Sequence, residues 1–108
     1  METKNVKIIT TSPESHADII REAMGKAGAG AIGKYTFCSI SSKIIGRFKP
    51  EQGANPFIGK IGKIEEVVEE KIEAICDRKK LKDVINAIKV VHPYEEPVLE
   101  IYPLEDFQ

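Results

Sequence analysis

The sequence predicts an α+β sandwich in which a four-stranded antiparallel sheet is covered on one face by two helices. Three observations support this fold class: a length of 108 residues, a composition with 42% hydrophobic and 31% charged residues, and two successive segments that each follow a strand, helix, strand pattern. A chain of this length has room for one hydrophobic core, so residues 1–108 are expected to form a single domain. The composition is typical of a folded globular protein.

The first strand and the first helix are predicted over residues 6–28. Residues 6–11 are rich in β-branched side chains, which predicts a strand that stops at Ser12-Pro13. Serine caps helices and proline suits the first helical position, so we expect a helix to begin there. Gly28 is expected to end this helix. Its apolar positions, spaced for one helix face, are Ile20, Ala23, Met24 and Ala27.

A second strand and a long loop are predicted to follow. Tyr35 and Phe37 alternate with other residues over about positions 34–42, which predicts a strand with its aromatic side chains on one face. Glycine and proline then recur too closely over residues 43–62 for regular structure, which predicts a long loop or a bent extension with a short hairpin-like excursion. A loop of this length inside a compact domain is more often functional than idle.

The segment over residues 64–76 fits two interpretations. Its apolar spacing alone favours a helix, but Asp77 resembles the N-cap of a following helix, so we expect a strand over about 66–76. A final strand is predicted over 98–102 and is expected to end at Pro103. The helix between them has apolar positions Leu81, Val84, Ile85 and Ile88. This order of elements is the pattern of a ferredoxin-like βαββαβ sandwich.

The charge balance argues against two classes of partner. The chain has 16 basic and 17 acidic residues, for a net charge of −1, so no overall field favours nucleic acid or anionic lipid. Its apolar runs are far shorter than the ~20 residues that a membrane-spanning helix needs. Cys38 and Cys76 are the only cysteines, and the N-terminus does not resemble a secretory signal. We therefore expect a cytoplasmic protein with reduced thiols, and neither a nucleic-acid nor a membrane partner.

Three glycines, Gly28, Gly30 and Gly33, match the G-x-G-x-x-G pattern of dinucleotide-binding loops. That pattern requires a strand before it and a helix after it, so that phosphate meets free helix amides. Here the order is reversed, so the run is interpreted as a helix end with a tight turn. A backbone this rich in glycine could also allow a ligand or a neighbouring subunit to approach closely.

The segment HPYEEP is the most chemically suggestive part of the chain. Its residues are His92, Pro93, Tyr94, Glu95, Glu96 and Pro97. The histidine and the two glutamates are residue types that bind divalent metals, which gives one interpretation. The other is a structural connector, because the prolines hold the backbone extended and the neighbouring glutamates then point in opposite directions. In the second case Tyr94 is expected to pack its ring while its hydroxyl reaches a polar partner.

Three motifs in a fixed order resemble those of one known family. They are GAGAIGKY at residues 28–35, PEQGANPFIG at 50–59 and HPYEEP at 92–97. Together they resemble the insert domain of the NGG-one-interacting-factor-three-like (Nif3-like) family over nearly the whole chain, here as a stand-alone chain. The resemblance implies a fold similar to PII signalling proteins and to CutA, which are ferredoxin-like and commonly trimeric.

Two features of that family are not matched. Full-length members carry a dinuclear metal centre on flanking domains without counterparts in these residues, so their hydrolase activity is not carried over. Members also have a glycine-rich turn, G-x-G-x-F, where this sequence has Ile44, Ile45, Gly46, Arg47 and Phe48. Only Gly46 and Phe48 remain in register with that turn.

We therefore expect a non-enzymatic, PII-like or CutA-like module without a cofactor. It is expected to form a homo-oligomer, with a trimer favoured, and to bind a small ligand or a partner protein between subunits. The alternative is a divalent-metal-dependent hydrolase that uses His92, Glu95 and Glu96. Besides residues 92–97, the candidate ligand or interface residues are Gly28, Gly30, Gly33, Tyr35, Gly53, Ala54, Asn55 and Pro56.

Overall fold

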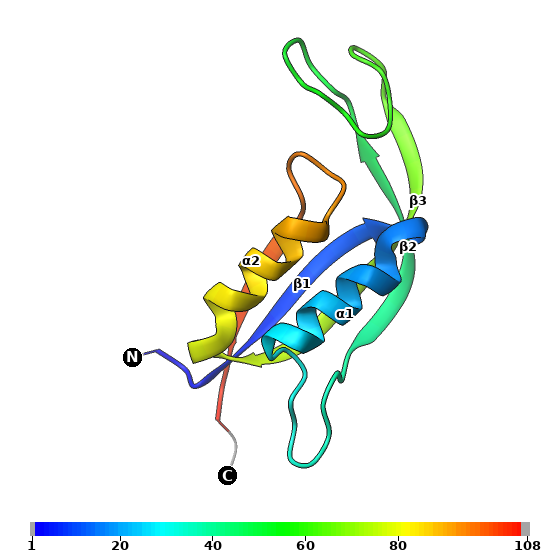
Figure 1. Cartoon of the computed structure of the whole chain (residues 1–108). Coiled ribbons are helices and arrows are strands. Elements are labelled where there is room, and N and C mark those ends of the chain that lie inside the picture. The colour runs from blue at the N-terminus through cyan, green and yellow to red at the C-terminus, as the bar shows by residue number, and fades with distance from the viewer. Residues whose placement is uncertain (1, 107–108) are drawn as a thin grey trace.

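The structure, a computed structural model, describes residues 2–106 and confirms the predicted α+β sandwich (Figure 1). The strands are all antiparallel and form one four-stranded sheet in the order β2-β3-β1-β4. Both α-helices lie on the same face of this sheet (Figure 1). The elements are β1 (Asn5–Pro13), η1 (Glu14–His16), α1 (Ala17–Ala27), β2 (Ile40–Phe48), β3 (Glu65–Asp77), η2 (Arg78–Lys80), α2 (Leu81–Val91) and β4 (Leu99–Leu104).

A hydrophobic core lies between the helices and the sheet. Every second residue of a strand points to the same face, so β1 and β3 each contribute one set of buried side chains to this core. The helices contribute the stripes predicted from their periodicity. The core contains Val6, Ile8, Ile20, Met24, Ile72, Ala74, Cys76, Val84 and Ile88. Burial, with a smaller effect of Asp77, raises the pKa of the Cys76 thiol, so this cysteine is a core residue and not a nucleophile.

The predicted start of the first helix is wrong. β1 continues through Pro13, and α1 begins at Ala17 after the short 3-10 helix η1. The Ser12 hydroxyl donates to the Pro13 carbonyl at 2.8 Å and caps no helix. Proline is tolerated here because β1 pairs with β4 only as far as Thr10, so beyond that point β3 is the only strand paired with it among residues 2–106.

The predicted second strand begins too early. β2 starts at Ile40 and runs to Phe48, so the strand takes up the first part of the predicted loop and leaves residues 49–64 as the loop. Residues 28–39 instead form a projecting hairpin-like loop, in which Ile32 and Tyr35 exchange two backbone hydrogen bonds of 2.8 and 2.9 Å. Phe37 has a φ of 60°, which no strand residue adopts.

The second half of the chain follows the prediction more closely. The predicted strand over 66–76 is confirmed as β3, and the Asp77 carboxylate accepts a hydrogen bond of 2.9 Å from the Lys79 amide. That cap opens η2, and α2 continues from it. β4 passes Pro103 and ends at Leu104, contrary to the prediction. As an edge strand, β4 can accommodate a residue without an N–H.

The opposite face of the sheet, which we call the open face, carries no helix of the described residues 2–106 (Figure 1). By strand register, Ile40, Ile44, Gly46 and Phe48 of β2 lie on this face together with Glu69, Glu73 and Ile75 of β3. Thr11 of β1 and Tyr102 of β4 lie on it as well. The pocket described next is built on this face. Neither α1 nor α2, nor any other helix within residues 2–106, is long and apolar enough to cross a membrane.

Candidate ligand pocket

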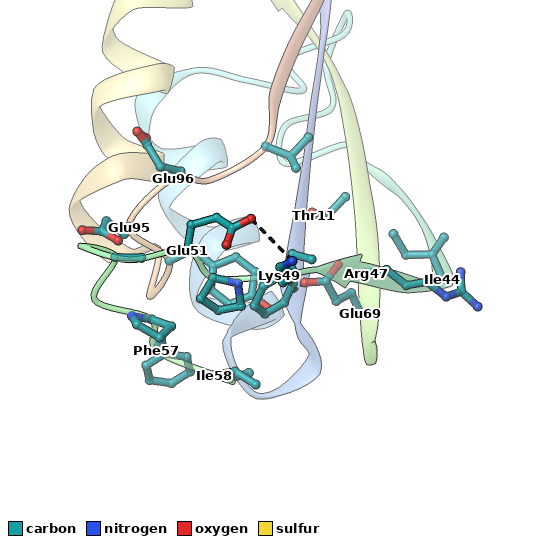
Figure 2. Close-up of a pocket in the computed structure, with 17 residues that line it drawn as sticks. Thr11, Ile44, Arg47, Lys49, Glu51, Phe57, Ile58, Glu69, Glu95 and Glu96 are labelled. Carbon is teal, nitrogen blue, oxygen red and sulfur yellow. Dashed lines mark hydrogen bonds and ion pairs between the residues drawn. The ribbon is translucent and has the colours of Figure 1, made fainter. Parts of the chain in front are cut away.

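A pocket of about 490 Å³ lies where the end of β2, the loop 49–64 and the connector 92–98 come together (Figure 2). The three segments are brought together because β2 leads directly into the loop while α2 leads into the connector. The loop is tied to the connector by a hydrogen bond in which the Asn55 amide donates to the Glu95 carboxylate at 3.1 Å. The apolar lining consists of Ile44, Phe48, Pro50, Ala54, Pro56, Phe57, Ile58 and Val98.

Tyr94 joins the aromatic wall of the pocket to its floor. Its ring centroid lies 6.0 Å from that of Phe48 and 6.4 Å from that of Phe57, within the range of favourable aromatic contacts. Its hydroxyl donates to the Glu69 carboxylate at 2.6 Å, so the expected polar partner of this tyrosine is present. Burial raises the Tyr94 pKa most, and the bond to Glu69 adds to the effect, so the hydroxyl stays protonated.

Glu69 forms the floor of the pocket and is only 4% exposed. Its Oε2 accepts from Tyr94, while its Oε1 lies against the backbone of β2. A Cβ atom at Gly46 would lie 2.1 Å from Oε1, so any side chain there would have to displace the Glu69 carboxylate. Glu69 is not among the site residues predicted from the sequence. The available signal was an acidic residue of β3 that pairs with Ile44 and lies diagonally across from Gly46, but it could not be interpreted without the register.

His92 has a structural position and does not fit a metal site. It is 8% exposed, its Nδ1 accepts from the Tyr94 amide at 3.1 Å, and its Nε2 therefore carries the proton that is donated to the Thr11 carbonyl at 2.7 Å. Burial lowers the His92 pKa, although the bond to Thr11 and the charge of Glu69 partly oppose this effect. Both ring nitrogens are occupied, so neither has a lone pair to offer a metal.

The glutamates of the connector do not complete such a site. Glu95 and Glu96 are exposed at the pocket rim, where Glu95 holds the loop through the Asn55 amide. Within residues 2–106 there is no group of three histidine, cysteine, aspartate or glutamate side chains placed to hold a metal ion. The interpretation of this segment as a metal site is therefore not supported by its geometry.

The candidate residues from the sequence separate into two groups at opposite ends of the molecule (Figure 1). Ala54, Pro56, Tyr94, Glu95 and Glu96 line the pocket, Asn55 bonds to it, and Gly53 lies in open space at the exposed tip of the loop. Pro93 and Pro97 are half-buried in the connector. Gly28, Gly30, Gly33 and Tyr35 belong to the hairpin-like loop 28–39, away from the pocket. Gly28 ends α1 with a φ of 115°, as the sequence predicts.

Known proteins share the sequence and the architecture of this chain. No family model matches the chain. It is 50% identical over 98 residues to the GTP cyclohydrolase 1 type 2 homolog of Halalkalibacterium halodurans, and 46% identical over 99 residues to that of Bacillus subtilis. A crystal structure of a Bacillus cereus protein related to NIF3 superposes with a TM-score of 0.84 at 37% identity, over 98% of this chain and 27% of that one. The resemblance to the Nif3-like insert domain is confirmed.

The chain spans 26% of the length of each of the two curated relatives, so what those proteins do as wholes does not transfer to it directly. The CutA protein of Archaeoglobus fulgidus shares its fold, with a TM-score of 0.71 at 22% identity over 96% of this chain and 87% of that one. A GlnK–ATP complex from Bacillus subtilis does so with a TM-score of 0.64 at 13% identity, over 96% and 84%. The predicted PII-like and CutA-like fold is thus confirmed.

Proposed function

We propose that this chain is a single, non-enzymatic PII-like domain that binds a small ligand in the pocket between residues 49–64 and 92–98. The observation that carries the proposal is the pocket itself, whose volume of about 490 Å³ lies within the range of small-molecule sites. Its composition also fits, since apolar and aromatic walls surround a few polar groups at the floor, Glu69 and Tyr94 among them. A more general role, that of a small module for ligand or partner binding, agrees with the PII-like and CutA-like fold.

The walls are supplied by different parts of the chain, which supports a ligand that is enclosed and not merely adsorbed. Phe48 comes from β2, Phe57 from the loop and Tyr94 from the connector. Phe57 is 52% exposed and also meets His16 edge-on, with ring centroids 5.4 Å apart. A ligand that covers this ring would bury apolar surface that is now in contact with water.

A fragment screen by thermal shift tests the ligand-binding proposal. We expect fragments that raise the melting temperature of the unmodified protein to lose this effect in Phe57→Ala, because the substitution removes one wall. Ile19→Ala is the matched control, since Ile19 is 50% exposed and lies on α1, outside the pocket. Hits that persist in Phe57→Ala and map to other residues by NMR would contradict the proposed site.

We further propose that the domain self-associates through the open face, with the trimer expected from the family resemblance as the favoured assembly. Three large side chains on this face are exposed: Ile40 by 68%, Ile75 by 38% and Tyr102 by 50%. They surround an ion pair between Lys7 and Glu73, at 3.2 Å. The edge strands β2 and β4 border the same face, and the outer edge of each has no strand neighbour among residues 2–106. Association would cover both the exposed side chains and the strand edges.

Light scattering at micromolar concentration tests the assembly. We expect a mass above that of the 12.0 kDa monomer, and Ile75→Lys should lower it by placing a charge in the interface. Val90→Lys is the control, since Val90 is 84% exposed on α2, on the other side of the sheet. A clean monomer in the unmodified protein would contradict self-association. We also propose a cytoplasmic location, where Cys38 and Cys76, both free in this structure, would stay reduced.

A further inference from the structure

Glu69 is a buried carboxylate whose charge is balanced by few partners. It is 4% exposed, and the only hydrogen bond that it receives within residues 2–106 is the one from Tyr94 to Oε2. No lysine, arginine or histidine nitrogen in this part of the chain lies within 4.0 Å of it. Buried charges are normally paired and fully hydrogen-bonded, because removing them from water is costly. Since Glu69 lines the pocket, a ligand group is the natural source of the missing partner.

The charges around the pocket point to the sign of that group. The lining has four acidic residues, Glu51, Glu69, Glu95 and Glu96, and two basic residues, Arg47 and Lys49 (Figure 2). Both basic side chains already have acidic partners: Arg47 lies 2.6 Å from Glu66, and Lys49 lies 3.8 Å from Glu51. The remaining field is negative, so it repels an anionic ligand and attracts a cation.

The walls fit a cation as well. Phe48, Phe57 and Tyr94 present aromatic rings beside the carboxylate, and the faces of aromatic rings attract ammonium and guanidinium groups within about 6 Å. The same rings and the neighbouring prolines favour a hydrophobic body on the ligand. The pocket therefore combines a single buried anionic group with apolar walls.

We infer that the ligand of this pocket is a small organic cation, in which a protonated amine or amidine on an apolar body donates to Oε1 of Glu69. This inference rests on the proposed ligand-binding function and specifies its chemical class. Glu69 supplies the charge that selects the head group, and Tyr94 fixes the carboxylate by holding the other oxygen. The aromatic wall takes the body of the ligand.

Three probes with a similar phenylalkyl body and different head groups test the inference. They are 2-phenylethylamine, 2-phenylethanol and 3-phenylpropionate, measured by NMR titration of the full chain at neutral pH. We expect the amine to bind about tenfold more tightly than the alcohol, which corresponds to one charge-assisted hydrogen bond, and the carboxylate to bind most weakly. The amine should shift the amide signals of Gly46 and Glu69.

Glu69→Gln is the decisive variant, because its amide oxygen can still accept from Tyr94 while the charge is removed. The preference for the amine should fall to within about twofold in this variant. It should stay at its original value in Glu100→Gln, which makes the same charge change at an exposed position on β4, outside the pocket. The amide-signal map of the unmodified protein gives an independent answer if Glu69→Gln does not fold.

The outcomes separate this inference from the proposed function. Equal binding of all three probes, lost in Phe57→Ala, would overturn the cationic class while leaving the pocket as a ligand site. An amine preference that persists in Glu69→Gln, or amide shifts confined to residues outside the pocket, would overturn the role of Glu69. Failure of every probe to bind at millimolar concentration would count against both the cationic class and the pocket.

Discussion

Tyr94→Phe should destabilise the protein although it removes a single oxygen atom. The lost hydroxyl donates to Glu69 at 2.6 Å, and the carboxylate would then be left without a donor among residues 2–106. The ring remains, so its contacts with Phe48 and Phe57 persist. The substitution therefore isolates one hydrogen bond to a buried charge.

The expected cost follows from the burial of the acceptor. Hydrogen bonds to charged groups contribute about 1.5–3 kcal/mol, and a 4% exposed carboxylate recovers little of this from water. We expect the free energy of unfolding to fall by about 2 kcal/mol, or the melting temperature by roughly 8–16 °C for a domain of this size. Tyr102→Phe, at a half-exposed position on β4, should change it by less than about 0.5 kcal/mol.

Urea unfolding followed by circular dichroism measures this difference. All variants must be compared at one protein concentration, because self-association would make apparent stability concentration-dependent. A double-mutant cycle with Glu69→Gln should give a coupling of about 1–2 kcal/mol between the two side chains. If Tyr94→Phe unfolds within about 0.5 kcal/mol of the unmodified protein, Glu69 does not depend on this bond and our account of the floor is wrong.

Three further predictions concern other parts of the molecule. Gly46→Ala should lower stability by roughly 1–3 kcal/mol in urea melts, because its methyl group would lie 2.1 Å from the Glu69 carboxylate, and no loss would contradict that packing. Gly30→Val should give little folded protein by circular dichroism, since Gly30 has a φ of +79° and its Cβ would lie 2.2 Å from the Cys38 carbonyl; tight NAD binding that this variant abolishes would instead indicate a dinucleotide site. Stability should fall as the pH drops below about 6.5, because burial lowers the pKa of His92 in the fold, so the stability present above its unfolded pKa of about 6.5 is lost as the pH drops through the folded value. His92→Gln should remove most of this slope.

The sequence predicted the elements whose signals are local. The α-helices follow the 3.6-residue spacing of their apolar side chains. For β3, the cap at Asp77 favoured a strand over a helix. The element boundaries that were predicted wrongly depend on which strands lie next to each other in the sheet. Pro13 and Pro103 stay within strands because of where β1 and β4 lie in the sheet, and no local pattern contains that information.

The second strand shows how a local pattern can mislead. Tyr35 and Phe37 alternate as strand residues do, yet the chain turns between Ile32 and Tyr35. Phe37 then adopts a left-handed backbone conformation, and its ring occupies the space beside Gly25, where a Cβ would lie 2.0 Å from it. The absence of a side chain on a helix residue therefore decides the position of an aromatic ring twelve residues later, which propensity alone does not reveal.

The candidate site was predicted in part. The motifs at residues 50–59 and 92–97 do meet at one pocket, but their partner Glu69 lies in a strand where acidic residues are common. A solvated glutamate and a buried one are identical in sequence. Only the pairing of β2 with β3, which sets Gly46 beside this carboxylate, distinguishes them.

The pairing of β1 with β4 has a consequence for how this fold can be combined with other sequence. Asn5 and Leu104 are direct partners across the two strands, so the chain enters and leaves the sheet at neighbouring points. A domain whose ends are adjacent can be spliced into a surface loop of a host protein without forcing the host's flanking segments apart. The same geometry would allow the ends to be joined and the chain reopened elsewhere, which makes circular permutants of this domain a practical route to tethering or exposing its pocket.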